Sequence, residues 1–186
     1  MSEQTIQEFA ATKGFHSHTQ QRWLSWKPQD GAALLNLALA LKAGENHLRD
    51  LMDWLEEISM RDGVAIQDVL GSEAITRIKT DPRLGRADRL KRVKDQIRRL
   101  RFPRLSQLED SIQSKIRALK LQPNVKLSVP PGLEGGDLRV EFSVGSPAQL
   151  KSILAKLNEA SECEFMTEIF VLLKGDASAE KPKPAR

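Results

Sequence analysis

The feature that most constrains this chain is a concentration of positive charge between Arg77 and Arg104. This segment of twenty-eight residues contains twelve Lys or Arg and three acids, Asp81, Asp88 and Asp95. Its local net charge of +9 exceeds the +4 of the whole chain, so the remaining residues are net negative. A local excess of this size is typical of a segment that contacts a polyanion, most often nucleic acid.

The composition indicates a water-soluble protein without a membrane partner. The 186 residues suffice for one ordinary domain or two small ones, and 40% of them are apolar. The longest apolar runs, such as 169–173, are far shorter than the ~20 residues that span a bilayer. No secretory signal is visible, and the single cysteine, Cys163, cannot form an internal disulfide. We therefore expect a cytoplasmic protein.

The part before the basic segment predicts a helical domain over 20–81, preceded by a flexible N-terminus over 1–19. Apolar residues at helical spacing predict one helix over 34–41, ended by Gly44, and a second over 48–59, ended near Gly63. Two short helices are expected to follow, and Asp81-Pro82 stops the second, because a residue before proline avoids the α region.

Residues 82–104 predict a basic linking helix. Leu90, Val93, Ile97 and Leu100 form one narrow apolar stripe, and cations cover the rest of its circumference. Arg outnumbers Lys in the basic segment by nine to three, which favours bidentate contacts with phosphate. We expect nucleic-acid contacts from Arg86, Arg89, Lys91, Arg92, Lys94, Arg98, Arg99, Arg101 and Arg104.

Residues 105–174 predict a small α-β-β-α-α interaction domain, so the fold class is α+β and mostly helical. A helix over 105–119 precedes two alternating strands, around 125–129 and 138–144, which a Gly-rich loop connects. Ser146-Pro147 predicts the start of the next helix, and Ser161 with Glu164 predicts a capping box for the last one. Residues 175–186 are expected to be a disordered tail.

The stretch from Leu105 to Leu157 resembles the C-terminal dimerisation domain of ParB-type partition proteins. The resemblance rests on Val125-Lys126-Leu127, on the segment 135–142, on Ser146 and Leu150, and on Ile153-Leu154. It implies that the second strand and the helix after it build a two-fold interface, and in some members basic residues there hold DNA. The chain departs from the family in its extra helix at 161–174. It also has no counterpart of the nucleotide-binding domain with its Gly-Glu-Arg-Arg signature.

The apolar face of the second strand and the following helix predicts self-association into a homodimer. Alternatively, the helix that carries Phe165, Ile169, Phe170 and Leu173 folds back and covers this face within one chain. The residues expected to mediate self-association are Leu138, Val140, Phe142, Val144, Leu150, Ile153 and Leu154.

Two other segments have a functional and a structural interpretation. Residues 57–75 could form a DNA-reading helix-turn-helix, but an ordinary turn between bundle helices is favoured because this region is acidic. Trp23 and Trp26 could stack on bases, and we favour instead that they anchor the N-terminal segment to the core.

No pattern predicts catalysis, a metal or a cofactor. His16, His18 and His47 lack the partners of a zinc site, and the acids beside Cys163 disfavour a reactive thiolate. Gly132 to Gly136 lacks the Lys of a phosphate-binding loop. We therefore expect a non-enzymatic protein that binds DNA or RNA with tolerance for sequence. The alternative is an adaptor whose basic helix docks on an acidic surface of a larger complex.

Overall fold

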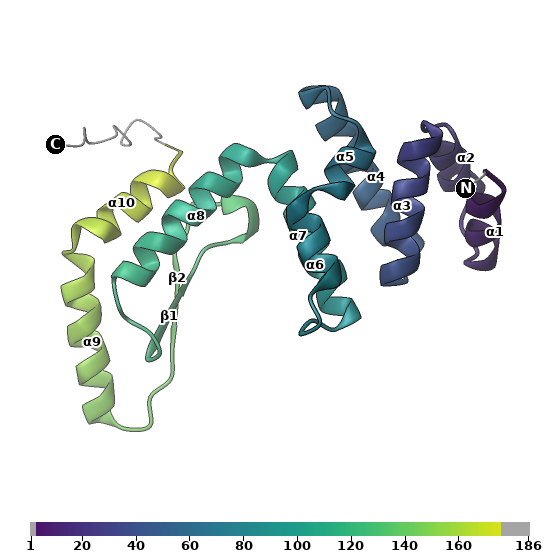
Figure 1. Ribbon diagram of the computed structural model, residues 1–186. Coiled ribbons are helices and arrows are strands. Elements are labelled where there is room, and N and C mark those ends of the chain that lie inside the picture. Colours follow the sequence, from purple (N-terminus) through teal and green to yellow (C-terminus); the bar gives the residue numbers. More distant parts are fainter. Residues whose placement is uncertain (1–2, 176–186) are drawn as a thin grey trace. The chain divides into compact units, whose positions relative to one another are not determined.

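The computed structural model describes residues 3–175 and divides into two compact units, Met1–Pro103 and Arg104–Arg186 (Figure 1). The first unit contains both the helical domain expected over 20–81 and nearly all of the basic helix expected over 82–104, which is therefore part of the bundle and not a separate linking helix. Within the described residues, helices predominate and one sheet has two antiparallel strands, so the mostly helical α+β class is confirmed. Apart from Gly175, the expected disordered tail lies outside the described residues.

The first unit is a bundle of helices around a core of leucines and isoleucines, among them Leu34, Leu51 and Ile97, all fully buried. Helix α3 ends at Leu41 with Lys42 as a left-handed C-cap, so the expected end at Gly44 is wrong, and Gly44 is instead the N-cap of α4. The C-cap of α4 is Gly63 with φ 67°, as the sequence predicts. The helices are α1 (Glu3–Thr12), α2 (Ser17–Leu24), α3 (Pro28–Leu41), α4 (Glu45–Asp62), α5 (Ile66–Gly71), α6 (Glu73–Thr80) and α7 (Arg86–Arg101).

The expectation of a flexible segment over 1–19 is wrong for its described part, which contains α1 and the start of α2. Ile6 and Ala10 are buried, and Phe9 meets Trp23 edge-on with ring centroids 6.0 Å apart. These apolar residues form a stripe too narrow to stand out among polar neighbours, and it becomes stable when buried against the core. Trp23 is fully buried and donates from Nε1 to the Gly31 carbonyl at 3.1 Å, so it is an anchor.

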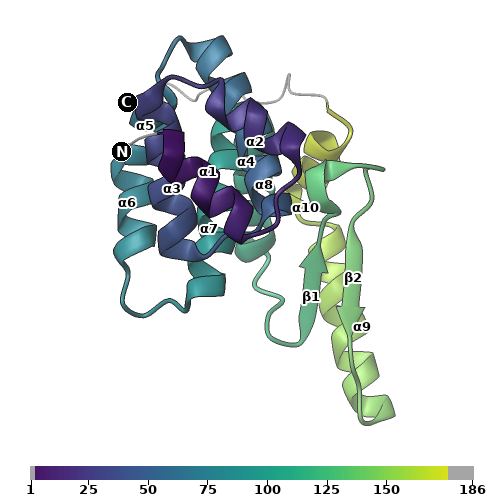
Figure 2. The ribbon, with the colours of Figure 1, turned by 90° about the vertical axis from the view of Figure 1, so that its right-hand side faces the viewer.

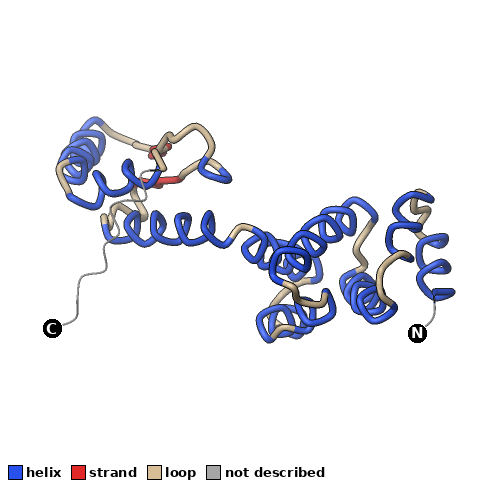
Figure 3. Tube along the Cα trace, turned by 90° about the horizontal axis from the view of Figure 1, so that it is seen from above, coloured by secondary structure: helices blue, strands red, loops and turns tan. Residues whose placement is uncertain are grey.

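The second unit combines helices with the two-stranded sheet, in which the strands lie side by side (Figures 2 and 3). Val125 pairs with Phe142 and Leu127 pairs with Val140, so the two alternating segments form the expected antiparallel strand pair. The elements are α8 (Pro103–Ala118), β1 (Val125–Ser128), the short 3₁₀ helix η1 (Pro131–Leu133), β2 (Arg139–Phe142), α9 (Pro147–Ser161) and α10 (Glu164–Leu173).

One helix start in this unit is as predicted and the other is not. Ser146 is the N-cap of α9, and its hydroxyl accepts from the Gln149 N–H at 3.2 Å. The capping box of Ser161 with Glu164 is wrong, because Ser161 is the last residue of α9 and its hydroxyl donates to the Asn158 carbonyl at 2.7 Å. Cys163 occupies the N-cap of α10 instead, without a side-chain cap.

Candidate nucleic-acid interface

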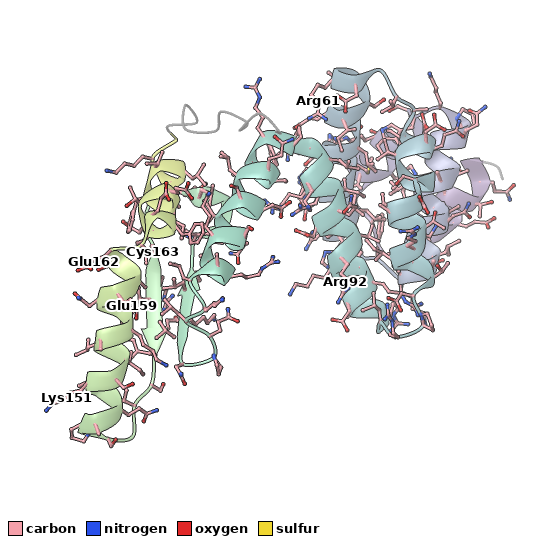
Figure 4. The ribbon with its side chains drawn as sticks, turned by 60° about the vertical axis from the view of Figure 1, so that its left-hand side comes forward. Arg61, Arg92, Lys151, Glu159, Glu162 and Cys163 are labelled. Atoms are coloured by element: carbon pink, nitrogen blue, oxygen red, sulfur yellow. The ribbon has the colours of Figure 1, made fainter. Side chains whose placement is uncertain are left out.

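Helix α7 is fixed in the first unit by a narrow apolar stripe. Val93 and Ile97 are fully buried, and Leu90 packs half-buried against the same core. The C-terminal end of α7 is held by Arg61 of α4, which donates to the carbonyls of Leu100 and Arg101 at 2.8 and 2.6 Å (Figure 4). A cation there satisfies carbonyls that have no partner inside the helix. The stripe and this cap decide which face of α7 is exposed.

Two of the nine predicted nucleic-acid-binding residues form ion pairs with acids of α4. Lys94 Nζ lies 2.6 Å from Asp50 Oδ2 and 5.4 Å from the centre of the Trp54 ring. Arg101 donates to both carboxylate oxygens of Glu57, with 2.6 Å between Nη2 and Oε1. Both cations are more than three-quarters buried, so they hold α7 against α4 rather than face solvent.

Three further predicted residues also contact other parts of the chain. Arg89 donates from Nε and Nη2 to the Asp81 carbonyl, at 3.2 and 2.9 Å, and so ties the loop before α7 to the helix. Arg98 lies 3.6 Å from Asp95 within the helix. Arg98 and Arg99 are half-buried, and both interact with neighbouring residues. These three side chains therefore contact protein on one side and solvent on the other.

The remaining four predicted residues are Arg86, Lys91 and Arg92 of α7, and Arg104 of the second unit. All four are exposed, and among residues 3–175 none has a side-chain hydrogen bond or an ion pair. Arg92 (Figure 4) lies close enough to Asp81 to help lower the pKa of that carboxyl, which Arg83 chiefly brings to about 2. These side chains are therefore available to an anionic ligand.

A groove of about 480 Å³ lies between α4 and α7, and we call it the Trp54 groove. Trp54 is not among the residues predicted from the sequence. The signal that indicates it is its i, i+4 spacing from Asp50 on α4, beside the acids that pair with α7. The lining residues are Trp54 of α4 and Asp88, Lys91, Arg92, Lys94, Asp95 and Arg98 of α7.

The segment 57–75 contains the end of α4, a turn, the short helix α5 and the start of α6. Helix α5 has six residues, and three of them, Ile66, Val69 and Leu70, are buried. At its start, the Asp30 carboxylate accepts from the Gln67 N–H at 2.8 Å. A helix this short and this buried has little surface with which to read a major groove.

The predicted self-association residues divide between the core and the surface of the second unit. Ile153 is buried and Leu138 packs half-buried against the same core. Since β2 pairs only with β1 among the described residues, its other edge has no strand beside it. We call the exposed apolar residues of β2, α9 and their connection the β2–α9 face: Val140, Phe142, Val144, Leu150 and Leu154, which are 36 to 51% exposed.

The described residues contain no cluster of three or more His, Cys, Asp or Glu that could hold a metal ion. Cys163 lies at the turn between α9 and α10, near Glu159 and Glu162 (Figure 4). His16 contacts Glu45, and His47 Nδ1 lies 3.4 Å from Lys94 Nζ. Over 3–175, no helix is both long and apolar enough to cross a membrane.

Comparison with models of protein families, with curated proteins and with solved structures finds no match for this chain. The resemblance of residues 105–157 to the ParB dimerisation domain therefore stays a prediction.

Proposed function

We propose that this chain is a non-enzymatic cytoplasmic protein that binds the phosphate backbone of DNA or RNA through α7. The observation that carries the proposal is the set of exposed cations Arg86, Lys91 and Arg92, which have no side-chain hydrogen bond or ion pair among the described residues. Cations that already have a carboxylate partner would lose that interaction on binding a phosphate. Arg86 and Lys91 would lose none, and Arg92 would lose only its weak electrostatic interaction with Asp81.

The expected binding mode is electrostatic and tolerant of sequence. Each phosphate neutralised by Lys or Arg releases condensed counterions, so the affinity for B-DNA falls with salt at a slope of roughly 0.9 per contact. Arg86, Lys91 and Arg92 thus supply about three contacts, fewer than the nine residues selected from the sequence. Arg98 and Arg99, which are half-buried, can add to these without leaving the helix surface.

We further propose that the β2–α9 face mediates a homodimer. Five apolar side chains are exposed there beside an unpaired strand edge, and the ParB resemblance implies an interface in the same place. A dimer would present two copies of α7 to one polyanion and so raise the apparent affinity through effective concentration.

The first prediction tests the phosphate contacts. Replacing Arg86, Lys91 and Arg92 together by Gln is expected to reduce the salt slope by roughly 3 and to weaken binding equally for unrelated sequences. The measurement is fluorescence anisotropy of labelled duplex DNA over a salt series.

The matched control replaces Lys13, Lys27 and Lys42 by Gln, which removes the same charge from exposed positions outside α7. This control is expected to keep the wild-type slope. Absence of binding by the wild-type protein at low salt would refute the proposal, and equal losses in both triple variants would assign the binding to net charge rather than to α7.

One observation favours the adaptor as a second candidate function. Helix α7 already packs on an acidic helix of its own chain, with Lys94 paired to Asp50 and Arg101 paired to Glu57. An acidic helix of another protein could pair with Arg86, Lys91 and Arg92 in the same way. Under this alternative, competition by unrelated nucleic acids would leave the bound protein partner in place.

A further inference from the structure

The Trp54 groove joins an aromatic ring to side chains of both charges within the first unit. Its volume of about 480 Å³ lies within the range of small-molecule sites. Helix α4 contributes the indole, and α7 contributes four cations and the carboxylates of Asp88 and Asp95. The groove therefore offers an aromatic ring and hydrogen-bond acceptors in addition to the exposed cations of α7.

This lining fits a nucleotide better than a bare chain of phosphates. Two carboxylates repel phosphate, but they accept hydrogen bonds from the N–H groups on the edge of a base. The exposed cations can bind phosphate without an aromatic ring, whereas every base has a face that stacks on such a ring. In a duplex both faces of a base are covered by its neighbours, so only an unpaired base can use the groove.

Some side chains in the groove are held by neighbouring residues, and others are available to a ligand. Lys94 is held by Asp50 and by the face of Trp54, and Arg98 lies 3.6 Å from Asp95. Lys91 and Arg92 are exposed and have no side-chain hydrogen bond or ion pair among residues 3–175. The available cations therefore stand beside a ring whose position is already fixed by the core and by Lys94.

We propose that the Trp54 groove binds one unpaired nucleotide of a single-stranded nucleic acid. The base stacks on Trp54, and Lys91 and Arg92 hold its phosphate. This inference rests on the proposed function and adds to it a preference for single strands over duplexes.

The test compares three labelled probes of about 12 nucleotides, a length within the site sizes of single-strand binders. They are a single strand, its duplex, and an abasic strand with the same number of phosphates but no bases. Trp54→Leu is expected to weaken binding of the single strand about tenfold, the effect of one stacked base, and to leave the abasic strand unchanged. Trp26→Leu, a second half-buried tryptophan in the same unit, is the control and is expected to keep wild-type affinity.

Tryptophan fluorescence provides a readout that is independent of any loss of packing in Trp54→Leu. The single strand is expected to remove the same absolute emission, that of Trp54, from the wild type and from Trp26→Phe, and to quench Trp54→Phe less. Equal affinity of the wild type for the normal and abasic strands, with unchanged quenching in Trp54→Phe, would overturn the groove and leave phosphate binding intact. Failure to bind any of the three probes would remove both proposals.

Discussion

Glu45 connects the first turn of α4 to the start of α2 through three contacts. Its carboxylate accepts from the Thr19 hydroxyl at 2.5 Å and from the His16 backbone N–H at 3.1 Å, and it lies 2.8 Å from His16 Nδ1. The Thr19 hydrogen bond is the main cause that lowers the pKa of Glu45 to about 2, and the contacts with His16 add to it. One side chain thus links α4 to the start of α2, whose first residues lie in the segment expected to be flexible.

A pH-dependent prediction follows for Glu45. A lowered pKa in the folded state means that the ionised carboxylate stabilises the fold above its unfolded pKa of about 4.5. This contribution is lost as the pH falls toward about 2. Glu45→Gln is therefore expected to be less stable than the wild type in urea at pH 7, and the difference is expected to shrink steadily below pH 4.5. Glu8→Gln on the exposed face of α1 is the control. A stability difference for Glu45→Gln that does not change with pH would contradict this role.

At the scale of elements, packing in the bundle and the proposed binding use different faces of α7. Its buried stripe holds the helix in the bundle, and its exposed cations carry the proposed binding. Lys94 and Arg101 are cations that could bind phosphate, but they help to hold α7 in the bundle. The reason is that α4 places Asp50 and Glu57 opposite them. The number of cations on a helix therefore overstates the number that a ligand can reach.

This separation predicts opposite effects for two substitutions in α7. Ile97→Ala removes a fully buried side chain and is expected to lower the free energy of unfolding by about 2–5 kcal/mol. Arg92→Ala is expected to change it by no more than about 0.5 kcal/mol while weakening nucleic-acid binding. Urea unfolding followed by circular dichroism measures both. If Arg92→Ala were as destabilising as Ile97→Ala, Arg92 would be a structural residue instead.

At the scale of the whole molecule, the β2–α9 face determines the expected oligomeric state. Burying a side chain such as Phe142 contributes about 1.5–3 kcal/mol, so pairing two such faces is favourable. Two-fold dimers are also the commonest oligomers. Ile169 and Leu173 of α10 are buried and Phe170 is exposed, yet Val140 and Phe142 stay exposed. The covering helix considered as an alternative thus leaves this face open.

The corresponding prediction concerns mass in solution. The full chain is expected to form dimers at micromolar concentration, and Phe142→Asp is expected to be monomeric, because a charge at the interface would be desolvated without a partner. Leu39→Asp, which alters an exposed apolar residue of α3, is expected to remain dimeric. Light scattering measures the masses. A wild-type monomer at high micromolar concentration would remove both the dimer and the ParB resemblance.

The sequence by itself determined the local structure wherever one signal was strong. Helices α4 and α7 occur where apolar spacing predicts them, Gly63 ends α4, and Ser146 caps α9. The two strands also occur where the sequence alternates. The pattern of Ser161 with Glu164 was wrong because it fell on the end of a helix. Helix α1 was missed because its apolar stripe is narrow and is stabilised by burial against the core, which local sequence does not specify.

The tertiary structure alone decided which residues a ligand or partner can reach. Lys94 meets Asp50 and Arg101 meets Glu57 across 44 residues of sequence, and no periodicity specifies such a pair. Ile153 is 3% exposed and its neighbour Leu154 is 51% exposed, although both were expected to mediate self-association. The physical reason is that periodicity determines the spacing of side chains along one element, whereas exposure depends on what packs against that element.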